Sequence, residues 1–294
     1  MSLTYRKRSL VGKKVGKSLK GFGMAMVVWA WLEALTKALQ KIGARLKVVN
    51  RTRGVPLRFN VGTDRQGEFF TLSVNEESEG ADVRIVDVDP DLAQALILVV
   101  TKDEKGKEQK EKLLLGHDER HWFVAGVPEK ARNIKDAFRL LKPEAAHLSQ
   151  ERAGVGGKAL NKRRNKGFIR QGEWFFVPVQ FEPDKTHHIW KNEPIQRAPG
   201  SSPHTVEKLV RMGGQQVYIM GDKVYTQAQK DAYLATNGHG GGMAFRARTQ
   251  NATVFVTGKV SHKDHKAIYL QGWHAVHLSR EPGNTGRGAQ GFLD

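Results

Sequence analysis

Two short segments of this 294-residue chain place histidines beside carboxylates, a combination used by metal sites and acid–base centres. The first segment reads GHDERHW and begins at Gly116. The second lies within residues 253–278, which hold four of the eleven histidines, so potential chemistry is most concentrated there. The candidate catalytic residues are His117, Asp118, His121, His262, Asp264 and His265.

The second cluster has the tighter spacing. His262, Asp264 and His265 lie at the tip of a predicted hairpin, where a histidine pair three residues apart can converge. We therefore predict these three as ligands of a divalent metal, namely zinc, manganese or magnesium. If the two turns meet at one end of a sheet, both clusters can serve a metal-dependent nuclease or phosphoesterase, because a metal activates water and neutralises phosphate.

A plainer interpretation of both clusters stays open. No HExxH zinc motif is present, and a lone HxDH has no fixed meaning. Aspartate is common in tight turns because it hydrogen-bonds to its own backbone. On this interpretation the six residues are turn residues and residues at the rim of a core.

The charge of the chain points to a polyanionic partner. The formal net charge is +18, and residues 1–54 alone hold 13 basic residues and one acidic residue, a net +12. An N-terminal basic arm of this kind can lie along a phosphate backbone. The residues of the arm predicted to contact nucleic acid are Arg6, Lys7, Arg8, Lys13, Lys14, Lys17 and Lys20.

A second basic segment follows residue 150 and runs into aromatic residues. Basic side chains contact phosphates, and aromatic rings stack on unpaired bases. The residues predicted to contact nucleic acid here are Lys162, Arg163, Arg164, Lys166, Arg170 and Trp174. The alternative is a surface loop that enters a buried strand at Trp174.

The apolar pattern predicts a mixed α+β fold, mostly antiparallel β, with a basic N-terminal amphipathic helix. Apolar residues recur at steps of three and four across residues 24–46, which indicates a helix that packs on a core; the alternative is a helix that lies on a membrane surface or a partner. Alternating residues predict strands over most of 55–127, and a helix begins at Ile134 and ends before Pro143. Residues 253–278 form a predicted hairpin, and residues 206–212 are interpreted as a short helix.

These elements divide into two predicted lobes. Residues 1–54 form the basic arm and amphipathic helix, residues 55–150 an α+β lobe, and residues 168–280 a β-rich lobe that contains the second histidine cluster. Residues 151–167 form a basic, glycine-rich linker or loop. Residues 281–294 form a tail that we expect to be disordered.

Composition limits the cellular compartments and the classes of binding partner that we expect for this protein. The chain has no cysteine, which excludes disulfides and a thiol nucleophile and fits a cytoplasmic protein. The uninterrupted apolar run of residues 24–32 is too short to span a bilayer, so we expect no transmembrane segment. The sequence favours a nucleic-acid-binding protein, for DNA or RNA, that contacts mainly the phosphate backbone. The alternatives are the metal-dependent nuclease and a structural protein that binds an acidic partner.

Overall fold

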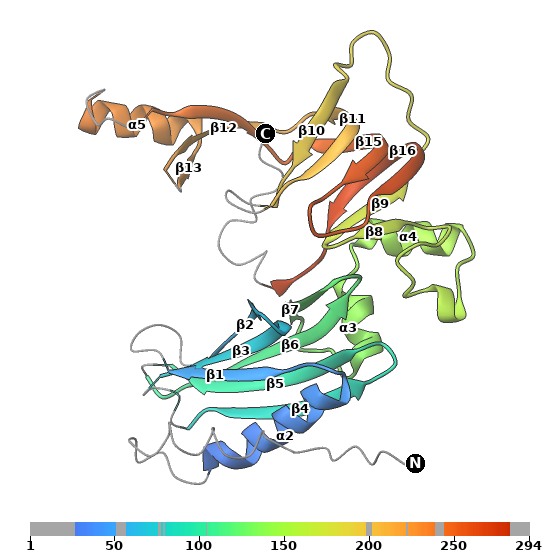
Figure 1. The fold of residues 1–294 in the computed structure, drawn as a ribbon. Helices are drawn as coiled ribbons and strands as arrows, with labels where there is room; N and C mark the ends of the chain where they lie inside the picture. Colours follow the sequence, from blue (N-terminus) through green and yellow to red (C-terminus); the bar gives the residue numbers. More distant parts are fainter. Residues whose placement is uncertain are drawn as a thin grey trace. The chain divides into compact units, whose positions relative to one another are not determined.

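The computed structural model describes residues 27–50, 57–75, 78, 80–103, 105–197, 202–221, 223–238 and 244–282. The chain forms two compact units, residues 1–111 and 112–294. Their boundary falls inside a strand, whereas the sequence analysis separated its lobes at residues 151–167. The predicted class is confirmed, because the fold is mixed α+β with several antiparallel sheets (Figure 1).

The first unit opens with the predicted amphipathic helix. Helix α2 spans Val27–Lys41, and its apolar stripe is buried at Trp31, Leu35 and Leu39. The helix packs against strand β4 (Asp82–Asp89), so the prediction that this stripe faces a core is confirmed. A three-stranded sheet in the order β1-β3-β2 follows; its strands are β1 (Leu46–Asn50), β2 (Leu57–Asp64) and β3 (Gly67–Val74).

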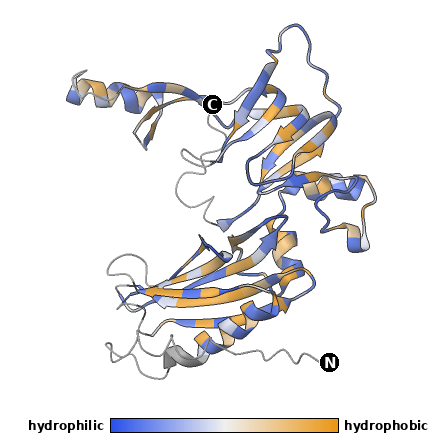
Figure 2. Cartoon of the chain, viewed as in Figure 1, coloured by the Kyte–Doolittle hydropathy of each residue, from blue (hydrophilic) through white to orange (hydrophobic). Residues whose placement is uncertain are grey.

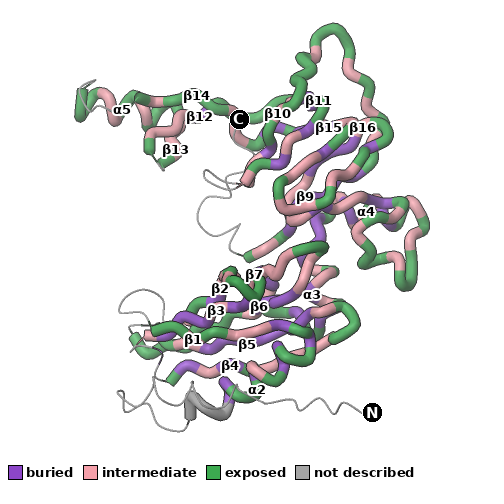
Figure 3. Tube along the Cα trace, in the orientation of Figure 1, coloured by how far each residue is buried: buried purple, intermediate pink, exposed green. Residues whose placement is uncertain are grey.

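Strand β4 belongs to a second sheet, in the order β4-β5-β6-β7. The other strands are β5 (Gln94–Lys102), β6 (Glu108–Asp118) and β7 (His121–Val127). Apolar residues run along β5, and most of them are buried (Figures 2 and 3). Asp118 pairs with His121 across β6 and β7, which leaves Glu119 and Arg120 as the two turn residues.

The second unit is built on a six-stranded antiparallel sheet in the order β10-β11-β15-β16-β9-β8. One face buries a core that includes Trp174, Leu209 and Val256. The other face is covered at β9 by Ala146 and Phe168. The strands are β8 (Ile169–Gln171), β9 (Trp174–Pro178), β10 (Trp190–Ile195), β11 (His204–Met212), β15 (Thr253–Ser261) and β16 (Ile268–Leu278).

Helices and a small insertion complete the unit. Helix α3 (Ile134–Leu141) lies where the sequence predicts it, and Asn133 caps it by accepting a hydrogen bond from the Asp136 amide. Helix α4 (Glu144–Arg152) and the 3-10 turn η2 (Gly157–Ala159) follow. Between β11 and β15 the chain inserts a sheet in the order β13-β12-β14, made of β12 (Gln215–Met220), β13 (Lys223–Tyr225) and β14 (Arg246–Gln250), with helix α5 (Gln227–Asn237).

The helix predicted at residues 206–212 is wrong. These residues lie in β11, which pairs with β10 on one side and with β15 on the other. Val206, Leu209 and Val210 are fully buried in this central position. β-Branched side chains suit a strand packed on both faces, and the sheet overrides the weak helical spacing. This correction matters for function because β11 begins at His204.

Candidate metal centre

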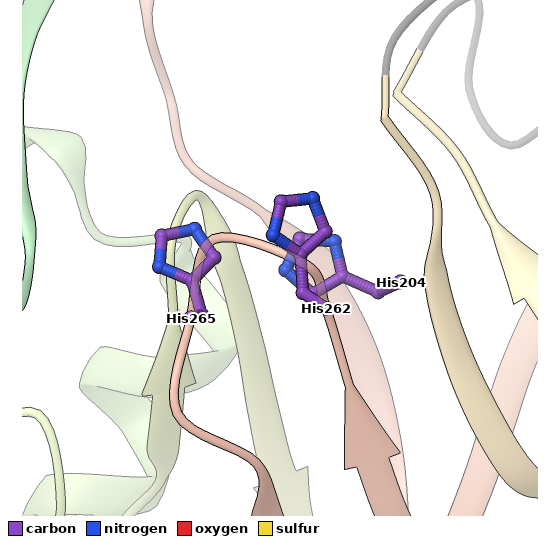
Figure 4. A group of neighbouring side chains, drawn as sticks. All are labelled: His204, His262 and His265. Atoms are coloured by element: carbon purple, nitrogen blue, oxygen red, sulfur yellow. The ribbon is translucent and has the colours of Figure 1, made fainter.

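Three histidines gather at one end of the six-stranded sheet (Figure 4). His204 is the first residue of β11, and His262 and His265 lie in the loop that joins β15 to β16. The antiparallel register brings them together, because Thr205 pairs with Ser261 and so places the start of β11 beside the end of β15. Residues 58 positions apart in sequence thus become neighbours.

The three imidazoles are close enough to share an ion. One nitrogen from each ring lies within 4.8 Å of the other two. The ring centroids of His204 and His262 are 4.2 Å apart with planes inclined by 21°, and those of His262 and His265 are 4.8 Å apart. Because a metal lies in the plane of each imidazole that binds it, binding requires these rings to rotate out of their stack.

Burial favours the neutral form of His204 and His265, which is the form that binds metal. His204 is 1% exposed, and burial, together with repulsion from His262 and His265, lowers its pKa to about 3. Burial also lowers the pKa of His265. In the described part of the chain, neither ring nitrogen of His204 has a hydrogen-bond partner. A buried polar atom without a hydrogen-bond partner lowers the stability of the fold, and a bound ion is one of the partners that such an atom can have.

The space around His265 is shaped by a glycine and a glutamate. Gly172 packs against the His265 ring. A Cβ atom on Gly172 would lie only 2.8 Å from His265 Nε2, so a larger residue would displace the ring. On the other side, Glu119 Oε2 lies 3.7 Å from His265 Nδ1. The same carboxylate oxygen accepts a 3.1 Å hydrogen bond from the Lys266 amide. The turn between β6 and β7 therefore meets the loop between β15 and β16, a meeting that the sequence leaves open, and the contact is made by Glu119.

Two arginines of the predicted nucleic-acid-binding segment form ion pairs with the turn between β6 and β7. Arg163 pairs with Asp118 and with Glu119, where Arg163 Nη1 lies 2.6 Å from Glu119 Oε1. Arg170 pairs with Asp118 at 3.2 Å. Burial lowers the pKa of Arg163 to about 10, and the facing carboxylates compensate for that burial by pairing with the cation. Arg163 thereby ties the basic loop, residues 157–167, to the turn beside the centre, and Arg170 contacts the same turn from β8.

The remaining cations of that loop face solvent. Lys162, Arg164 and Lys166 are exposed, and Arg164 donates a 3.2 Å hydrogen bond to the carbonyl of Tyr269. Because Lys162 and Arg164 flank Arg163, exposed positive charge lies close to the three histidines. The predicted contacts of the arm (Arg6, Lys7, Arg8, Lys13, Lys14, Lys17 and Lys20) and the predicted tail after residue 282 fall outside the described residues.

Only some of the predicted site residues lie in the histidine cluster. His262 and His265 belong to the cluster, whereas Asp264 lies at its edge, with Oδ2 4.0 Å from His262 Nδ1. His117 and His121 are not members; the His117 ring instead contacts Trp122 edge-on, at 5.0 Å between centroids. The stacking role predicted for Trp174 is corrected, because this side chain is 1% exposed in the core and cannot stack on a base.

His204 is the member of the histidine cluster that no sequence motif predicts. No motif joins it to the HxDH segment, and only the pairing of β11 with β15 brings them together. Across the described residues, no helix is long and apolar enough to cross a membrane. The chain matches no protein-family model, and no curated protein or solved structure is significantly similar to it.

Proposed function

We propose that the protein binds one divalent transition-metal ion through His204, His262 and His265 and uses it to hydrolyse phosphodiester bonds of a nucleic acid. The observation that carries this proposal is the cluster of three imidazoles, one buried and two half-buried, whose nitrogens lie within 4.8 Å of one another. Two nitrogens on one zinc ion lie at most about 4.2 Å apart, twice the bond length, so the rings must rotate out of their stack to bring the three nitrogens onto one ion.

The donor set favours zinc. Imidazole suits zinc and other late transition metals, whereas magnesium prefers oxygen ligands. Three histidines leave the fourth tetrahedral position for water or substrate, which is the pattern of catalytic rather than structural zinc sites. A divalent ion held there would supply a Lewis acid that makes water a nucleophile at neutral pH.

The surrounding charge supports an anionic substrate. Lys162, Arg164 and Lys166 are exposed on the loop that Arg163 ties to Glu119 beside His265. Exposed cations attract phosphate groups and raise the local concentration of a polyanion. In this arrangement the lysines and Arg164 hold the backbone, while the histidines hold the ion that acts on it.

The test is a cleavage assay on the full chain with single-stranded and double-stranded DNA and RNA, with zinc, manganese or magnesium added. We expect cleavage that a chelator stops and that His265→Ala abolishes. His117→Ala is the matched control, because His117 lies outside the cluster, and it should cleave like the wild type. Absence of cleavage with every metal and substrate contradicts the hydrolytic part of the proposal.

A second candidate function is nucleic-acid binding without cleavage. The uneven charge favours it, because residues 1–54 carry a net +12 of the total +18. Binding of this kind comes mainly from phosphate contacts and weakens steeply with salt. Salt-sensitive binding to oligonucleotides by a protein that never cleaves them would select this function over hydrolysis.

A further inference from the structure

We propose that Glu119 is a positioning residue of the metal centre: its carboxylate accepts a hydrogen bond from Nδ1 of His265 and thereby leaves Nε2 as the nitrogen that binds the ion. This inference rests on the proposed metal site and assigns a role to a residue that binds no metal itself. The present separation of 3.7 Å between Glu119 Oε2 and His265 Nδ1 must shorten to about 2.9 Å, and the rotation that takes the His265 ring out of its stack supplies this movement.

The backbone of Glu119 carries strain. Glu119 has a φ of 51°, in the left-handed region that glycine and asparagine occupy most readily. It occupies one of the two positions of the turn that joins β6 to β7. A non-glycine residue in this region costs on the order of 1 kcal/mol or more, and such outliers gather at functional sites. The hairpin turn holds Glu119 in this conformation and places its side chain at the loop that carries His265.

The carboxylate of Glu119 is held on both oxygens. Arg163 Nη1 lies 2.6 Å from Oε1, and the Lys266 amide donates to Oε2 at 3.1 Å. These partners come from the basic loop and from the loop that carries His265. Because both oxygens have partners, the carboxylate is fixed in direction before any ion binds, which is what a positioning group requires.

The two nitrogens of His265 have different surroundings. Nδ1 is buried, has no hydrogen-bond partner among the described residues, and has the Glu119 carboxylate as its nearest anion. Beside Nε2, Gly172 packs so closely that a Cβ atom on it would lie 2.8 Å away, so the absence of a side chain there is what lets the His265 ring take this position. A carboxylate beside one ring nitrogen is the arrangement by which proteins set the tautomer of a histidine ligand.

The test compares zinc affinity in the full-length wild type, Glu119→Gln and Glu119→Gly, measured by competition with a chromophoric chelator. Glutamine keeps the shape without the charge, and glycine relieves the backbone while removing the carboxylate. We expect both variants to bind zinc about 10- to 100-fold more weakly, as for the loss of other partners of metal-ligating histidines. Arg120→Ala, at the other turn position, is the control and should bind like the wild type.

A second readout separates positioning from stability. Bound Co²⁺ should give a visible absorption spectrum that differs between wild type and Glu119→Gln, while thermal unfolding of the metal-free proteins reports whether each variant is folded. Wild-type zinc affinity in a folded Glu119→Gly variant overturns the role of Glu119 and leaves the metal site intact. Failure of the wild type to bind zinc overturns the metal site itself, so the two failures are distinguishable.

Discussion

Burial sets the protonation state of individual residues in the second unit, and Lys142 shows this away from the histidines. The residue is 4% exposed, and its ammonium group donates hydrogen bonds to the carbonyl of Leu160 at 2.7 Å and to Gln150 Oε1 at 3.2 Å. Burial, with repulsion from Arg170 and Arg139, lowers its pKa to about 8. The unfolded chain keeps this proton until about pH 10.4.

A pH dependence of stability follows for Lys142. Between about pH 8 and pH 10 the folded protein has released this proton while the unfolded chain retains it, so the free energy of unfolding rises with pH by up to about 1.4 kcal/mol per unit. Lys142→Met lacks this contribution. The free energy of unfolding of both proteins should be measured in urea at pH 7, 8, 9 and 10. The difference between wild type and Lys142→Met should increase, in favour of the wild type, only above pH 8. A constant difference across this range would contradict the assignment.

Prediction from sequence succeeds for residues that are neighbours along the chain. His262 and His265 share one loop, so their convergence follows from spacing alone. His204 and Glu119 reach the same place through strand register and a hairpin turn, neither of which leaves a local motif. The sequence therefore predicts two of the three histidines that lie together, while the strand topology supplies the third.

At the scale of elements, β9 shows that an aromatic residue after a basic run can belong to the core. Trp174 is 1% exposed within the apolar cluster of the six-stranded sheet, whereas Trp190 on the edge strand β10 is 44% exposed. Trp174→Ala should lower the free energy of unfolding by about 3–5 kcal/mol, and Trp190→Ala should cost much less. Equal losses in urea unfolding would show that β9 does not anchor this core.

Periodicity predicts α2 and α3 because one face of each is apolar and no neighbour competes for the backbone. It fails at β11, where the strands β10 and β15 supply backbone partners on both sides. The class of fold is thus predictable from sequence, whereas the position of a central strand depends on partners far away in the chain. That error hid His204, since a helix starting near residue 206 gives no reason to place it beside His262.

For the whole molecule, charge is the property that favours a polyanion. Removing residues 2–20 removes seven basic residues and no acidic residue. If these residues contact phosphates of duplex DNA, the slope of log affinity against log salt should become shallower by up to about 6, and affinity should fall. The measurement is oligonucleotide binding by fluorescence anisotropy from low to moderate salt. Equal affinity and slope for the truncated chain would assign the binding to other residues or exclude it.

The central claim is that His204, His262 and His265 form one metal site, and zinc stoichiometry tests it most directly. Elemental analysis after zinc loading and dialysis should find one zinc per wild-type chain. The double variant His262→Ala/His265→Ala should bind none, and His117→Ala should still bind one. Thermal unfolding confirms that each variant is folded. No zinc on the wild type, or one zinc on a folded double variant, would contradict the account.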